Sequence, residues 1–393
     1  MLSSVAAVAL ALSAQDFGVE WLDRVTHDVE QPRYPLSVHP VETQLQAGAM
    51  YEYDSNVFFD PTRDREHGAS VILPFARARL DYAAPRWDAA ADLLVDYRRY
   101  EPEAHESGDD ERAYGRIRYA GPRVTLEVAE ILLHESDPVD VQIPERVDRI
   151  VSTTTGHGAV EVTHAFSLEA DVQVEVARFR DPLYDGSNNE MLRAGAGAAF
   201  RVSPSLEVLA QGGWLMIDYT HAETPGAQGA YGRVGVRGDP VSRLSVTALV
   251  GVIGVRSETV PSTGQHEEAR TADVSINLRY EPMDGLVLWA DYTREIGFAE
   301  PGDPFEVIDR AVLIGEWQAT PKVSLRARLE RDDAKSALGV EHTWWSLGPT
   351  ATWAFSGHIK ADLGVTYRRG ELSGAGQDTF SDVVGHLGVV FTR

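Results

Sequence analysis

The chain lacks cysteine altogether, which excludes disulfides, thiolate nucleophiles and cysteine-ligated metals. Beyond Ala14 it has no run of eighteen apolar residues, which excludes helices that span a membrane. It is also poor in positive charge, with 36 Lys and Arg against 60 Asp and Glu and a net charge of −24. Nucleic acid is therefore not an expected partner, because no basic surface is available to neutralise phosphates.

Motifs for catalysis or cofactor binding are also missing. The sequence shows no nucleophile elbow, phosphate loop or zinc motif. His157 and His164 attract attention as a hydrolase pair, but they are separated by seven positions. Residues at an odd spacing in a strand point to opposite faces, so these two cannot converge with a serine and a carboxylate. The sequence predicts a protein that is not an enzyme and holds no cofactor or metal.

What the chain does contain is alternation. Only 43% of its residues are apolar, but the wall of a membrane barrel needs an apolar side chain only at every second position. In the segment 87–98, Trp87 and Leu93 alternate with Asp88 and Asp92. This pattern is typical of a strand with one apolar and one wet face.

Short turns separate these alternating segments at regular intervals. Eight are recognisable, at 83–86, 120–123, 165–167, 202–205, 238–241, 281–285, 319–322 and 355–358. Longer polar loops lie between them, among them the acidic segment 101–111, which we interpret as a solvated loop. Eight turns and nine longer loops predict about eighteen strands. Residues 41–393 are therefore expected to form an all-β, transmembrane antiparallel β-barrel of about 18 strands in the bacterial outer membrane, with its short turns facing the periplasm.

A water-soluble sandwich is the alternative fold with alternating strands. It would need two large buried faces, whereas the apolar residues here suffice for one face of each strand. Aromatic residues also gather at the predicted strand ends, for example Tyr119, Trp317 and Trp353, as in the interfacial girdles of membrane barrels. Both features favour the membrane barrel, with lipid as its outer partner.

The polar row of each strand is expected to face the lumen, because a charge on the lipid face is costly. The predicted pore-lining residues are Asp88, Asp92, Asp96, Arg98, Arg116, Arg118, Glu169, Asp171, Glu175, Arg193, Arg201, Arg233, Arg237, Arg326, Arg328 and Glu330.

The start of the chain is expected to lie outside the barrel. Residues 1–14 resemble a signal peptide, since an apolar run ends in small residues near Ser13 and Ala14, although no Lys or Arg precedes it. Residues 15–40 contain three prolines and alternate poorly. We interpret them as a periplasmic lead or a partial plug of the lumen.

The opening of the predicted barrel suggests a family. Its first strand ends in Tyr51-Glu52-Tyr53-Asp54-Ser55-Asn56-Val57-Phe58. This resembles the opening of the β-barrel porins found in exopolysaccharide export clusters. The resemblance implies an outer-membrane channel through which a secreted polysaccharide passes, with the polysaccharide and periplasmic export components as partners. The alternatives are a general diffusion porin for small solutes and a structural barrel with a plugged lumen.

Overall fold

The computed structural model describes residues 41–55, 68–101, 107–135, 148–180, 182, 186, 188–220, 224–260, 264–298, 303–337, 339–373 and 378–393. The predicted signal peptide at 1–14 and the lead or plug at 15–40 lie outside these residues.

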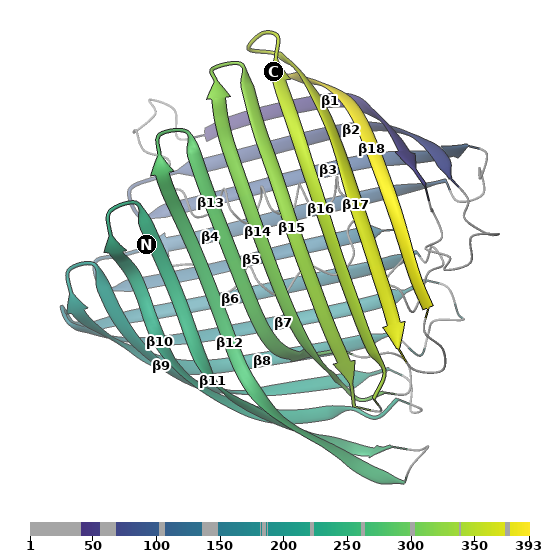
Figure 1. The fold of residues 1–393 in the computed structure, drawn as a ribbon. Coiled ribbons are helices and arrows are strands. Elements are labelled where there is room, and N and C mark those ends of the chain that lie inside the picture. Colours follow the sequence, from purple (N-terminus) through teal and green to yellow (C-terminus); the bar gives the residue numbers. More distant parts are fainter. Residues whose placement is uncertain are drawn as a thin grey trace.

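The described chain forms one antiparallel sheet of 18 strands that closes on itself, because β1 pairs with both β2 and β18 (Figure 1). The predicted fold class is therefore confirmed. The strands are β1 Val41–Asp54, β2 Ala69–Ala83, β3 Trp87–Glu101, β4 Gly108–Ala120, β5 Val124–Glu135, β6 Arg149–Thr163, β7 Phe166–Phe179, β8 Asn189–Ser203, β9 Leu206–Tyr219, β10 Ala227–Val241, β11 Leu244–Val260, β12 Gln265–Met283, β13 Leu286–Gly297, β14 Glu306–Thr320, β15 Val323–Ser336, β16 Glu341–Ala354, β17 Ile359–Ser373 and β18 Asp378–Thr392.

The short turns gather at one end of the barrel, at the upper left of Figure 1, and the longer connections at the other. We call these the turn side and the loop side. One turn differs from the sequence prediction, because 238–241 belongs to β10 and the chain reverses at Ser242 and Arg243. Gly238 has a φ of 141°, which a glycine adopts without strain. The strand can therefore continue past it with a shifted register.

Several strands run further into the loop side than the sequence predicts. Residues 108–111, expected in an acidic loop, belong to β4, and the connection between β15 and β16 is only 337–340. Charged residues support these extensions by pairing along and across strands. Arg331 contacts Asp333 at 2.8 Å, and Thr343 on β16 donates to Asp333 at 2.8 Å. The sequence pattern therefore did not predict where these strands end and the loops begin.

Apolar side chains cover the outer face of the sheet. Tyr51, Leu93 and Leu363 are among the many large apolar residues that remain exposed. Aromatic pairs lie near both ends of the wall, with Trp87 and Tyr119 on the turn side and Trp345 and Tyr367 towards the loop side. No helix among the described residues has the length and apolarity needed to cross a membrane.

Such an apolar surface around the whole wall would be unstable in water, since soluble monomers rarely expose large apolar patches. A closed sheet, an apolar outer band and aromatic residues near its edges together describe a barrel of the bacterial outer membrane. The predicted localisation is therefore correct, and lipid is the partner of the outer face.

Candidate functional site: the charged interior

The interior face of the barrel carries the charged rows of the strands. Residues paired directly across an antiparallel sheet lie on the same face. All sixteen predicted pore-lining residues lie on the inner face of the sheet, and the exposed apolar residues lie on its outer face. Their lining of a water-filled pore stays a prediction. In the structure Arg201 is exposed and Asp88, Arg116, Arg118, Asp171, Arg193, Arg237, Arg326 and Arg328 are half-buried, whereas Asp92, Asp96, Arg98, Glu169, Glu175, Arg233 and Glu330 are buried.

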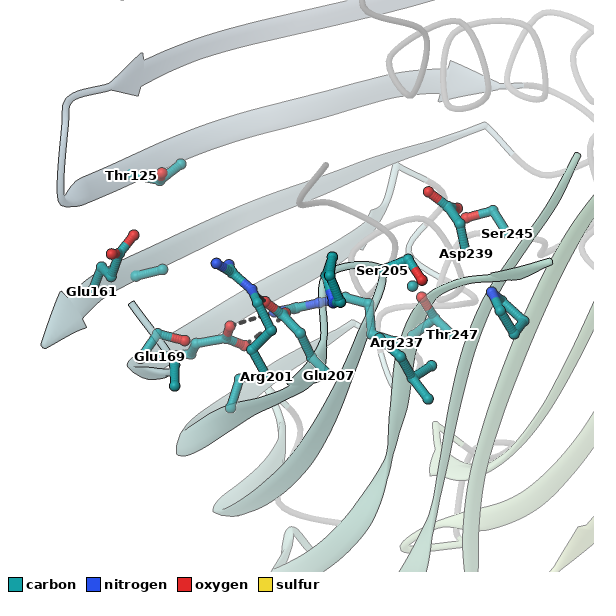
Figure 2. Close-up of a pocket in the computed structure, with 18 of the residues that line it drawn as sticks. Thr125, Glu161, Glu169, Arg201, Ser205, Glu207, Arg237, Asp239, Ser245 and Thr247 are labelled. Carbon is teal, nitrogen blue, oxygen red and sulfur yellow. Dashed lines mark hydrogen bonds and ion pairs between the residues drawn. The ribbon is translucent and has the colours of Figure 1, made fainter. Parts of the chain in front are cut away.

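A cavity of about 1020 Å³ opens among the turns that connect the strands from β4 to β11; we call it the vestibule. Figure 2 shows the ion pairs on its wall. Arg237 contacts Glu169 at 2.6 Å and Glu207 at 2.8 Å, and Arg201 contacts Glu207 at 3.0 Å. Hydroxyl groups such as that of Thr125 line the same space. The vestibule therefore offers paired charges and hydroxyls to a polar solute.

Deeper along β10, a second group of charges spans the interior. Arg193 on β8 contacts Asp273 on β12 at 3.1 Å and Glu295 on β13 at 3.1 Å. Four strands lie between β8 and β13 in the sheet. Neighbouring strands cannot explain this pair, so the two walls must approach each other within the combined reach of an arginine and a glutamate side chain. We call Arg193, Tyr231, Arg233, Asp273 and Glu295 the crossing cluster.

Tyr231 organises the positive half of this cluster. The guanidinium carbons of Arg193 and Arg233 lie 4.6 Å and 5.3 Å from the centre of its ring, within the range of cation–π attraction. The ring lies over Gly213 and Gly195, which pair with each other and, through Gly213, with Tyr231. A Cβ at Gly213 would approach the Tyr231 ring carbon Cζ to 2.5 Å, so these positions must be glycine for the ring to lie against the wall.

Phe298 and Phe305, which lie between β13 and β14, pack inward above the crossing cluster. Phe305 is buried in an apolar group that includes Leu215, Ile217 and Ile253 of the interior face. Phe298, on the same connection, lies edge-on to Tyr219 with ring centres 6.4 Å apart. On this side of the barrel the interior is therefore narrowed from the loop side by apolar packing and, beneath it, by the crossing cluster.

A ladder of ion pairs runs along the interior face of β3 to β6. It comprises Asp96, Arg98, Asp110, Arg112, Glu135 and Arg149, all buried. Arg112 contacts Asp96 at 2.5 Å, and Arg98 contacts Asp110 at 3.2 Å. The interpretation of 101–111 as a solvated loop is thus wrong for Asp110, because β4 turns this carboxylate inward between two arginines. Residues 102–106 lie outside the described part of the chain.

The two histidines are not brought together. His157 lies on the interior face, where its Nδ1 is 2.6 Å from Asp171, and His164 lies in an exposed turn beside Glu161 at 3.0 Å. Among the residues that the structure describes, no three His, Asp or Glu side chains are grouped as metal ligands.

Sequence reasoning missed several members of the site, namely Tyr231, Asp273, Glu295 and Glu207. Glu207 and Asp273 alternate with apolar residues as the predicted positions do, so alternation alone could have added them. It could not have paired them, because Arg193 and Glu295 are 102 positions apart and meet only through the closure of the barrel.

No protein-family model and no curated protein matches the sequence. Solved outer-membrane porins have a similar course of the chain. The BenF-like porin of Pseudomonas fluorescens Pf-5 is 10% identical, with a TM-score of 0.45 over 90% of this chain and 99% of that one. Pseudomonas aeruginosa OpdK with vanillate is 9% identical, with a TM-score of 0.43 over 90% and 98%. Pseudomonas aeruginosa OccK2 in complex with glucuronate is 14% identical, with a TM-score of 0.43 over 90% and 97%. At these identities the similarities assign no solute to this chain.

Proposed function

We propose that this protein is a diffusion channel for small hydrophilic solutes, rather than the polysaccharide channel that the sequence resemblance implies. The observation that carries the proposal is the ion pair between Arg193 and Glu295, which joins walls separated by four strands. A barrel of this size is wide enough for an aqueous channel, and opposed charges across a narrowed interior let small polar solutes exchange contacts with the wall.

Passage of a secreted polysaccharide, which the sequence resemblance implies, has less support. A polymer needs an open cross-section along its whole path. The crossing cluster and the inward packing of Phe298 and Phe305 both reduce that cross-section. Export components in the periplasm likewise stay a prediction.

The test is the conductance of the purified full chain in planar bilayers, together with the uptake of sugars of increasing size into proteoliposomes. The double variant Arg193→Ala/Glu295→Ala should admit larger sugars than the unchanged protein, because the side chains that join the two walls are gone. The matched control is Arg331→Ala/Asp333→Ala, which removes an exposed pair at the loop side and should leave the size limit unchanged.

The other outcomes decide between the alternatives. Absence of any conductance or uptake would contradict the channel and favour a plugged structural barrel. Uptake of long polysaccharides by the unchanged protein would contradict the small-solute reading and favour polymer passage.

A further inference from the structure

The charges of the crossing cluster are sorted by wall. The positive side consists of Arg193 on β8 and Arg233 on β10, whose guanidinium carbons lie 4.6 Å and 5.3 Å from the centre of one tyrosine ring. The negative side consists of Asp273 on β12 and Glu295 on β13. Two cations therefore face two anions across a narrow part of the interior.

These charges are shielded from solvent, which limits what can replace them. The side chains of Asp273 and Arg233 are 2% and 6% exposed. A buried charge that loses its partner is strongly destabilised. A solute that enters the cluster and separates its ion pairs must therefore supply a partner to the charges on both walls.

A single ion cannot do this. An anion could take the place of Glu295 beside Arg193, but it would separate Glu295 from the arginine that contacts it at 3.1 Å. A cation beside Glu295 would separate Arg193 from that carboxylate in the same way. A neutral solute can hydrogen-bond to both walls, but it supplies no charge to either.

A zwitterion can replace both halves of the pair at once. Its carboxylate can accept hydrogen bonds from the guanidinium groups of Arg193 and Arg233, while its ammonium group donates to Glu295 or Asp273. Such charge-assisted hydrogen bonds are the stronger kind. One contact of the cluster is loose, because Nη1 of Arg233 is 3.9 Å from Oδ1 of Asp273, which is beyond hydrogen-bond length.

Arg233 and Asp273 lie in one register row of the sheet, with Gly251 of β11 between them. Glycine is required between them, because a Cβ at Gly251 would lie 2.7 Å from Cβ of Arg233. Gln211 accepts from Nε of Arg233 at 2.9 Å and so fixes the direction of the guanidinium group.

We propose that the crossing cluster is a selectivity site for small zwitterionic solutes of the amino-acid class, which bind with the carboxylate towards Arg193 and Arg233 and the ammonium towards Asp273 and Glu295. This inference rests on the proposed channel function and specifies its solute.

The test compares glycine with glycolamide, a neutral molecule of nearly the same size, by the swelling of proteoliposomes that contain the full chain. Glycine should enter roughly tenfold faster than glycolamide through the unchanged protein, the effect of a charged hydrogen bond. The double variant Arg193→Gln/Glu295→Gln should lose this preference while it still admits both solutes.

Single variants give a second readout. Glu295→Gln should shift the reversal potential in a sodium acetate gradient towards anion selectivity, and Arg193→Gln should shift it towards cation selectivity. The control Arg331→Gln/Asp333→Asn, on the exposed pair, should keep the glycine preference.

The failures are distinguishable. If neither glycine nor glycolamide enters, the channel function itself is wrong. If both enter at equal rates through the unchanged protein, or if the double variant keeps the preference, the channel stands and the zwitterion site is refuted.

Discussion

Replacing Arg112 by leucine should strongly destabilise the barrel. This arginine is fully buried and contacts Asp96 at 2.5 Å, Asp110 at 3.4 Å and Glu135 at 3.8 Å. The ladder on β3 to β6 contains three arginines and three carboxylates, so its formal charge is zero. Arg112→Leu leaves one buried negative charge without compensation, and breaking a buried pair in this way costs about 3–5 kcal/mol.

The assay is the free energy of unfolding, measured by urea titration of the protein in lipid vesicles. The double variant Arg112→Leu/Asp96→Leu restores the balance of charge and should recover a large part of the loss. The control Arg331→Leu removes one partner of the exposed Arg331–Asp333 pair and should cost about 0–1 kcal/mol. If Arg112→Leu and Arg331→Leu lowered the unfolding free energy equally, the ladder would not act as a buried network and the reasoning would be refuted.

Three further predictions concern topology, faces and the tyrosine support. An epitope inserted in the connection between β3 and β4 should be detected on intact cells and one at Pro204 should not; the reverse result would invert the proposed orientation. Leu363→Arg, on the exposed apolar row, should lower the unfolding free energy by about 2–4 kcal/mol, whereas Asp362→Arg on the opposite face should cost less; equal effects would contradict the assignment of faces. Gly213→Val should displace the Tyr231 ring, since even a Cβ would lie 2.5 Å from Cζ of that ring; unchanged selectivity between glycine and glycolamide in this variant would show that the ring does not position the arginines.

The strands and their faces could be predicted from the sequence because both are local properties. An alternating segment such as 87–98 specifies its own faces, since successive side chains of a strand point to opposite sides. The turns could also be predicted where proline or glycine stands between two alternating segments, as at Pro122 and Gly285. The number of strands followed from counting these segments.

The ends of the strands on the loop side were harder to predict from the sequence, for a physical reason. Acidic residues such as Asp110 suit a solvated loop and an interior wall equally well, and only the pairing partners decide between them. Arg98 and Arg112 supply those partners on β3 and β4, so the strand extends through residues that composition alone had assigned to a loop.

The sequence by itself therefore determined that this chain forms a closed, outward-apolar barrel, because alternation and turn chemistry act over a few neighbouring residues. Only the tertiary structure decided which charges meet. Arg193 finds Glu295 across four intervening strands, and Arg237 finds Glu169 from β10 to β7. These contacts depend on the curvature of the closed wall and on the register of every strand pair between them, and no local pattern along the chain records either.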